Sequence, residues 1–162
     1  MNIALLAAVA LALLLGFVVF FGPPWLPTKD RHIGLALDLL ELKPGQTLLD
    51  LGSGDGRVLV AAARRGVRAV GIELSPILAL ISWLRTRRYR KQVRIIWGSY
   101  FVVEWPPADA LFTFMIPRQM TRLDRRIEQW HTKPLRLASF AFEISGKVPE
   151  AVQKGVFVYR YK

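Results

Sequence analysis

The stretch "LLDLGSGDGRVLV", residues 48–60, decides the fold of this chain. Residues 47–51 are typical of a buried strand, and residues 56–65 are typical of the helix that follows it. Three glycines stand within five positions of the turn between them: Gly52, Gly54 and Gly56. Glycine adopts backbone angles that other residues avoid, and without a Cβ it lets a ligand approach the main chain. We therefore expect a ligand-binding turn where the first strand meets its helix.

Strands and helices alternate along the rest of the chain. Helical periodicity predicts three further helices with these buried stripes: Ile33, Ala36, Leu37 and Leu40; Ile77, Leu80, Ile81 and Leu84; Met120, Leu123, Ile127 and Trp130. Further strands are predicted at residues 67–73, 93–97, 110–115, 137–144 and 156–161. This alternation is typical of an α/β protein with a Rossmann-like, doubly wound, mostly parallel sheet. The last two strands are too close in sequence for a parallel crossover, so we expect the last one to be antiparallel.

The spacing G-x-G-x-G after Asp50 narrows the choice of ligand. A nicotinamide dinucleotide fingerprint would place its third glycine where Arg57 stands, and a P-loop would need a Lys-Ser/Thr pair. Glu73 ends the next strand, where a carboxylate can accept hydrogen bonds from both hydroxyls of an unphosphorylated ribose. A turn without a ligand and a solvated acid at the strand end are the alternatives. The residues favour an adenosyl ligand with a free ribose.

The strings "LLDLGSGDGR" and "AVGIELSP" resemble class I S-adenosylmethionine-dependent methyltransferases, and the resemblance covers residues 28–162. With an N-terminal hydrophobic segment and a "PT" pair before the first helix, the chain is similar to a subgroup of small membrane-anchored lysine methyltransferases. That subgroup modifies the ATP synthase c-subunit and the adenine nucleotide translocase. The resemblance implies S-adenosylmethionine as the cofactor and a membrane-protein lysine as the acceptor. A lipid, quinone or RNA acceptor and a non-catalytic membrane-bound binding module are the alternatives.

The resemblance also implies roles for individual residues. The glycine turn and Asp50 would line the methionine end of the cofactor, and Glu73 would hold the ribose. Ser99 stands where the family commonly has an acidic residue against the adenine amino group. Thr28 matches the "PT" position, although a helix cap explains it equally well. The implied cofactor-binding residues are Thr28, Asp50, Gly52, Ser53, Gly54, Gly56, Glu73 and Ser99.

The substrate side carries fewer signals. Met115 and Pro117 stand where many relatives have an Asp/Asn-Pro-Pro motif, and the Asn-Pro-Pro-Tyr of amino-methylating DNA enzymes is absent. Desolvation lowers the pKa of a lysine amine, so the reaction does not require a general base. His32 and His131 fit structural or surface positions better than catalysis, and the catalytic residues remain unknown. Cysteine is absent, which excludes thiolate metal sites, and we expect no metal.

The N-terminal segment predicts a membrane anchor. Residues 3–21 are uninterruptedly apolar, and at about 1.5 Å per residue they reach roughly 28 Å, close to the ~30 Å hydrocarbon core. A signal peptide and a buried helix are the alternatives, but no basic n-region is present. Lys29 and Arg31 flank only the C-terminal end, which places the rest of the chain on the cytoplasmic or matrix-equivalent side. The expected organisation is an anchor (1–22), a proline-rich linker (23–27) and a methyltransferase domain (28–162).

The net charge of +11 belongs entirely to residues 29–162. Such a field favours anionic partners. A basic run contributes much of it: Arg85, Arg87, Arg88, Arg90, Lys91 and Arg94. A solvated helix end and a contact with anionic lipid headgroups are the two main interpretations of this run. Nucleic acid is not an expected partner, because no recognisable RNA-binding module accompanies the charge.

Overall fold

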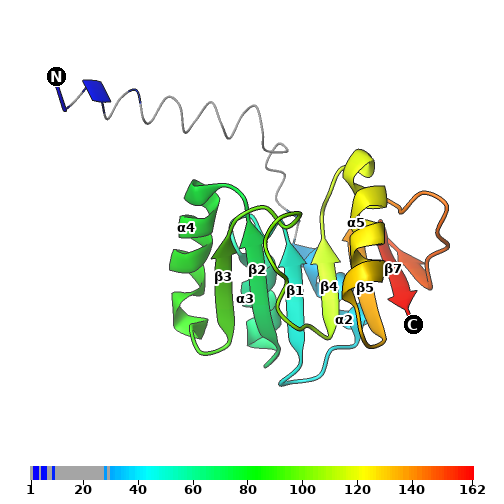
Figure 1. Ribbon diagram of the computed structural model, residues 1–162. Coiled ribbons are helices and arrows are strands. Elements are labelled where there is room, and N and C mark those ends of the chain that lie inside the picture. The colour runs from blue at the N-terminus through cyan, green and yellow to red at the C-terminus, as the bar shows by residue number, and fades with distance from the viewer. Residues whose placement is uncertain (1, 4, 7–8, 10–27, 29) are drawn as a thin grey trace.

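The computed structural model describes residues 2–3, 5–6, 9, 28 and 30–162. Its centre is a seven-stranded mixed sheet in the order β3-β2-β1-β4-β5-β7-β6 (Figure 1). The strands are β1 (Thr47–Leu51), β2 (Arg68–Glu73), β3 (Val93–Trp97), β4 (Ala110–Thr113), β5 (Leu135–Phe140), β6 (Ala151–Gln153) and β7 (Val156–Tyr161). The helices are α2 (Asp30–Leu40), α3 (Arg57–Arg64), α4 (Pro76–Thr86), α5 (Pro117–Trp130) and the short 3₁₀ turn η1 (Arg87–Tyr89).

The sheet is parallel from β3 to β5 and antiparallel beyond it. β1 pairs in parallel with both β2 and β4, while β7 runs antiparallel to β5 and to β6. The predicted mostly parallel sheet with an antiparallel last strand is therefore confirmed. Because β1 lies between β2 and β4, the chain leaves β1 in one direction and later returns on its other side. The crevice beyond the carboxyl end of β1 is where such sheets bind ligands.

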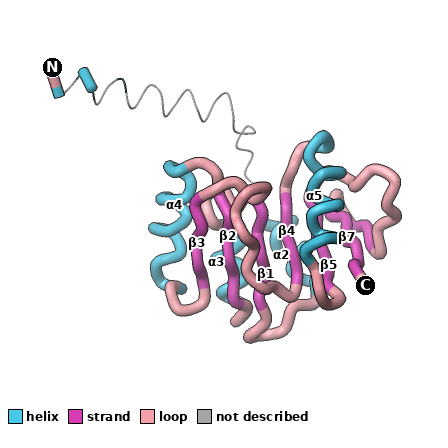
Figure 2. The backbone as a smooth tube through the Cα atoms, in the orientation of Figure 1, coloured by secondary structure: helices cyan, strands magenta, loops and turns pink. Residues whose placement is uncertain are grey.

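Helices pack on both faces of the sheet. Leu37 of α2 and Leu59 of α3 belong to the core on one face, and Met120, Leu123 and Ile127 of α5 belong to the core on the other. Figure 2 shows α5 on the near side of the strands, with α2 and α3 behind them. Each such fully buried side chain contributes about 1.5–3 kcal/mol to folding. These two cores hold the carboxyl ends of the central strands in a fixed position.

The predicted buried face of α4 is wrong. Its buried residues are Ala79, Ser82 and Thr86, whereas Leu80 and Leu84 of the predicted stripe are 57% and 48% exposed. The apolar stripe of the helix therefore faces away from the sheet. This orientation follows from the contact between α4 and the glycine turn, which is so close that only small side chains fit between them.

One strand prediction near the C-terminus needs correction, and one short strand was missed. The strand predicted at residues 137–144 is β5, which starts at Leu135 and ends at Phe140. The next residue, Ala141, has a φ of 68°, and strands do not accommodate that backbone angle. β6 is too short and too exposed to leave a sequence pattern, and it was not predicted.

The predicted anchor and linker lie almost entirely outside the described residues. Within the described ranges, no helix combines the length and apolar composition that a bilayer span requires. Thr28, the first residue of the expected domain, is described and buried. The domain boundary at residue 28 stays a prediction.

Candidate active site

The glycine turn forms as expected at the carboxyl end of β1. Gly52, Gly54 and Gly56 all have positive φ angles, of 85°, 55° and 79°. Other residues pay a conformational penalty in this region, so the turn requires glycine at these positions. The amides of Gly52 and Ser53 both donate to the Ile72 carbonyl, at 2.9 and 3.0 Å, which ties the turn to the neighbouring strand β2. The backbone of the turn is thus held in place on one side and open on the other.

Glu73 lies across the turn, at the end of β2. Its Oε2 accepts a hydrogen bond from the Gly54 amide at 2.8 Å, and its Oε1 accepts one from the Ser75 amide, also at 2.8 Å. One carboxylate therefore connects the glycine turn to the start of α4. Burial raises the pKa of Glu73, and hydrogen bonds from the Ser75, Gly54 and Leu74 amides partly offset that rise. Each carboxylate oxygen keeps acceptor capacity for a further donor such as a ribose hydroxyl.

Asp50 is the least compensated charge of the site. It is 2% exposed, and its Oδ2 has no hydrogen-bond partner within the described part of the chain. Burial raises its pKa well above the ordinary value, and the nearby charges of Glu73 and Asp55 raise it further. A buried acid with an open oxygen between two other acids favours a cationic ligand at this end of the turn. The buried Ser53 Oγ likewise has no described partner.

Asp55, in contrast, is fully paired. It accepts hydrogen bonds from Arg57, the shortest at 2.8 Å, and forms an ion pair with Arg85 of α4. Burial would raise the pKa of Asp55, but the hydrogen bonds and charges of Arg57 and Arg85 outweigh burial and lower it. Arg57 also donates to the Thr28 carbonyl at 3.2 Å. The structure therefore brings Thr28 to the edge of the glycine turn.

Helix α4 lies directly against the turn. A Cβ added at Gly56 would come within 3.1 Å of the Cα of Ser82. A larger residue at position 82 would collide with the turn, so the face of α4 toward the turn is lined by small residues. Ser75 caps the helix, because its hydroxyl accepts a hydrogen bond from the Leu78 amide.

The loop after β3 forms the next wall of the site. Ser99 initiates its turn: the Oγ accepts from the Phe101 amide at 3.2 Å, and the carbonyl accepts from Val102 and Val103. The guanidinium of Arg126, on α5, donates to the Phe101 and Val103 carbonyls at 2.5 and 2.8 Å. Arg126 therefore fixes this loop from the neighbouring helix α5.

Tyr100 is a site residue that the sequence reasoning missed. Its ring lies beside Gly52, where an added Cβ would be 3.8 Å from Cε1, and its hydroxyl donates to Gln119 Oε1 at 2.8 Å. Burial, and then the charge of Glu73, raise its pKa to about 12. The only signal in the sequence was its position, directly after Ser99 at the carboxyl end of β3.

The expected substrate-side residues, Met115 and Pro117, lie between the C-terminal end of β4 and the first turn of α5. Met115 is buried in the core beneath α5, and Pro117 is exposed at the first turn of that helix. His32 stacks on Phe140 with ring centroids 4.7 Å apart, near the end of β5. His131 follows the C-terminal end of α5 and packs on Tyr161, so it lies away from the glycine turn.

Aromatic side chains gather beyond the ends of β4 and β5. Phe114 and Phe140 have centroids 5.0 Å apart, and Phe114 and Phe142 have centroids 6.2 Å apart. Such rings desolvate a neighbouring group and attract a cation through their faces. The turn, Glu73 and Asp50 fit a ligand with a ribose and a cationic end, and the rings fit an amine acceptor.

Comparisons with known proteins agree with this geometry. The sequence model of the ANTKMT methyltransferase domain matches residues 50–151. Over 80% of its own length, the chain is 30% identical to the human (Homo sapiens) lysine N-methyltransferase of the ATP synthase c-subunit. The match covers only 56% of that human protein. A "Protein-lysine N-methyltransferase" of Saccharolobus islandicus is 26% identical, with 81% of this chain and 84% of that protein covered.

A solved structure is also similar over most of both chains. It is an RNA methyltransferase from Salinibacter ruber in complex with S-adenosyl-L-homocysteine. The TM-score is 0.77 at 26% identity, and the match covers 84% of this chain and 92% of that one.

Proposed function

This chain belongs to the family of the ANTKMT methyltransferase domain, and on that premise we propose that it methylates a lysine amine of a membrane protein. S-adenosylmethionine is the cofactor, as expected for a chain that is similar to a methyltransferase bound to S-adenosyl-L-homocysteine. The observation that carries the proposal is the buried carboxylate of Glu73 over the glycine turn, beside the open Oδ2 of Asp50. Relatives that are named as lysine methyltransferases support the acceptor class.

The residues of the turn fit the two ends of this cofactor. Glu73 would accept hydrogen bonds from the ribose hydroxyls, and the Gly52–Gly56 backbone would lie against the nucleoside without steric hindrance. Asp50 would face the cationic methionine end, where its uncompensated charge is relieved. When bound, the cofactor supplies an electrophilic methyl group on a sulfonium. The role of the chain is to align that group with the acceptor, since orientation supplies much of the catalysis in an in-line displacement.

The acceptor amine must lose a proton before it can attack. Phe114, Phe140 and Phe142 would exclude water from a lysine side chain at this edge of the sheet, and desolvation lowers the pKa of an amine. No side chain is assigned as a general base. The aromatic cluster thus supports a small alkyl amine as the acceptor.

The membrane location rests on residues 3–21. Their length and composition match a spanning helix, and the position of Lys29 and Arg31 supports a domain on the cytoplasmic or matrix-equivalent side. An anchored domain meets substrates within or beside the bilayer. The acceptor in this proposal is therefore a lysine of a membrane protein near the bilayer surface.

RNA is the second candidate acceptor. The net charge of +11 and the similarity to the Salinibacter ruber RNA methyltransferase favour it. Lipid and quinone acceptors and a non-catalytic binding module remain alternatives without a specific observation in their favour.

One experiment separates these candidates. The full chain is incubated with membranes from the same cells and with S-adenosylmethionine carrying a labelled methyl group. Label in a membrane protein, retained after solvent extraction and nuclease treatment and mapped to lysine by mass spectrometry, supports the proposal. Label lost on nuclease treatment would identify RNA, and label lost on extraction would identify a lipid or quinone.

A matched pair of variants tests the site in the same assay. Glu73→Gln removes the carboxylate charge that would hold the ribose hydroxyls and should abolish labelling. Glu150→Gln alters an acid at the far edge of the sheet, where Glu150 pairs with Arg136, and should leave labelling intact. Cofactor binding with no transfer to any membrane fraction would instead indicate a binding module.

A further inference from the structure

Helix α4 presents its apolar face to solvent. Leu80, Trp83 and Leu84 are 57%, 60% and 48% exposed, and Ile81 is 39% exposed. We call these four residues the apolar face of α4. Figure 1 shows α4 at the β3 end of the sheet, the opposite end from β5 and β7. Trp97, on the edge strand β3, is also exposed, at 69%.

The packing of the helix fixes this orientation. Ser82 and Thr86 are buried, and Ser82 contacts Gly56 so closely that no larger side chain fits between α4 and the turn. Thr86 Oγ1 donates back to the Ser82 carbonyl at 2.8 Å, which satisfies its hydroxyl inside the packed face. Rotating α4 to bury its leucines would force them into the glycine turn. The exposed apolar face is thus required by the site and is not a packing defect.

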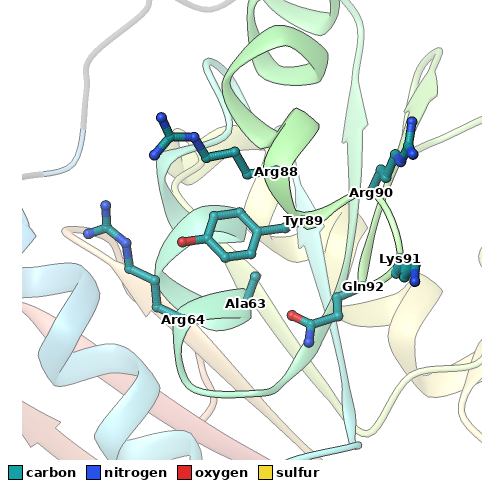
Figure 3. A pocket seen from close by; sticks show the side chains of 7 residues that line it. All are labelled: Ala63, Arg64, Arg88, Tyr89, Arg90, Lys91 and Gln92. Atoms are coloured by element: carbon teal, nitrogen blue, oxygen red, sulfur yellow. The ribbon is translucent and has the colours of Figure 1, made fainter.

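A strongly basic surface continues from the C-terminal end of α4. We call it the basic cluster, and it consists of Arg87, Arg88, Arg90 and Lys91, all exposed. None of the four forms an ion pair with any described residue. Arg88, Arg90 and Lys91 also line a hollow of about 460 Å³ together with Arg64 and Tyr89 (Figure 3). Figure 3 shows Arg64 and Arg88 on one side of Tyr89, with Arg90 and Lys91 on the other.

We propose that the apolar face and the basic cluster together bind the surface of an anionic lipid bilayer. A helix with one apolar side lies parallel to the membrane surface, with that side buried about 5–10 Å into the boundary between headgroups and acyl chains, and tryptophan favours this depth. The exposed Trp83 and Trp97 would lie at this boundary. The basic cluster then meets the anionic headgroups.

Charge complementarity favours a bilayer on this surface over two alternatives, a second copy of the chain and residues 3–21. A second copy of this chain would bring two uncompensated basic clusters together, which like-charge repulsion opposes. Residues 3–21 could cover the apolar face, but they carry no acid to pair with the cluster. A bilayer with anionic lipid matches both halves of the surface at once.

This inference adds a second membrane contact to the proposed function. It rests on the proposed function only for the side of the membrane on which the domain lies. Docking is measured without a methyl donor, so loss of methyl transfer leaves the docking result intact. Conversely, a domain that does not dock through α4 can still methylate a lysine.

The chain lacks cysteine, so single probes can be introduced cleanly. Leu84→Cys in the full chain, labelled with an environment-sensitive fluorophore, is reconstituted with phosphatidylcholine vesicles that contain or lack phosphatidylglycerol. The control is Val148→Cys, at a residue that is 89% exposed beyond β5. We expect a blue shift and quenching by nitroxide lipids at position 84 with phosphatidylglycerol, and neither at position 148.

Removal of charge tests the second half of the surface. Replacing Arg87 and Arg88 by Gln removes two charges, each worth about fivefold in partitioning at an anionic surface. Quenching at position 84 should then fall to the level found with phosphatidylcholine alone. A blue-shifted probe that nitroxide lipids do not quench in either kind of vesicle would indicate that residues 3–21 cover the apolar face of α4. A shift that grows with protein concentration would assign it to a second copy, and either result overturns the proposal.

Discussion

Ser82 of α4 and Gly56 of the glycine turn are in direct contact: a Cβ at position 56 would lie 3.1 Å from the Ser82 Cα and closer still to its hydroxyl. Gly56 therefore serves two purposes. It adopts a φ of 79°, and it lets α4 approach the turn. A sequence pattern identifies the first purpose, and only the structure reveals the second.

Gly56→Ala should be far more damaging than an alanine at a comparable glycine. The positive φ costs about 1–2 kcal/mol, and the collision with Ser82 adds about 1–3 kcal/mol of overpacking. Gly45 is the matched control, because its φ is 87° and an added Cβ would meet nothing within 4 Å. Chemical denaturation of both variants measures the difference. Equal losses of unfolding free energy would mean that α4 does not constrain the turn.

Asp50→Asn should stabilise the ligand-free protein at neutral pH while weakening cofactor binding. Burial raises the pKa of Asp50 in the folded state, so the contribution of this group to stability is present below the ordinary value of 3.8 and is lost as the pH rises through the raised pKa. The buried Asp50 carboxyl therefore lowers the free energy of unfolding at neutral pH, and asparagine removes that cost. Tm should rise by roughly 2–4 °C for each kcal/mol of unfolding free energy regained. The gain should vanish at acid pH.

Asp55→Asn is the control of opposite sign. Arg57 and Arg85 lower the pKa of Asp55 against the effect of burial, so its stabilising contribution is present above the ordinary value and is lost as the pH falls. The variant should lower Tm at neutral pH. Thermal scans over a pH series separate the two residues, and a shift of the same sign for both would contradict the electrostatic assignment.

Arg126→Met should loosen the loop after β3 without unfolding α5. The variant keeps the aliphatic stem and removes the donors to the Phe101 and Val103 carbonyls. Hydrogen bonds from charged groups contribute about 1.5–3 kcal/mol, so amide exchange in residues 99–105 should accelerate about tenfold or more. Arg125→Met, on the exposed side of the same helix, should leave exchange unchanged.

Tyr100 should stay protonated throughout the range in which the enzyme is assayed. Burial and the charge of Glu73 raise its pKa to about 12. Ultraviolet titration of the parent and of Tyr100→Phe should therefore give curves that coincide through the ordinary value of 10.0 and separate only near the raised one. Separation near 10.0 would show that the ring is solvated and does not lie against Gly52.

The sequence predicted the strands well because buried parallel strands are short apolar runs between breakers. It predicted the glycine turn at the end of β1 because closely spaced glycines after an apolar run mark such a turn, and the role of Glu73 in holding a ribose stays a prediction. It failed for α4, where the stripe of Leu80 and Leu84 is real but faces solvent. Periodicity identifies the apolar side of a helix. It does not identify the side that packs, which depends here on a glycine about 25 positions away.

Contacts between distant segments were also beyond prediction. No local pattern predicts that the guanidinium of Arg126 reaches two carbonyls more than 20 positions earlier in the chain. Tyr100 was visible only as the neighbour of Ser99, and its place beside Gly52 depends on how β3 pairs with β2 and β2 with β1. Such positions need the tertiary structure because no local pattern encodes them.

Glu73 is restrained from two sides before any ligand arrives. The amides of Gly54 and Ser75 hold its two oxygens, so the side chain loses its rotamer freedom during folding and not during association. Ordering a comparable glutamate on binding would cost about 0.5–1.5 kcal/mol. The side chain is therefore already ordered in the ligand-free protein, and a ribose bound as proposed would meet a rigid carboxylate.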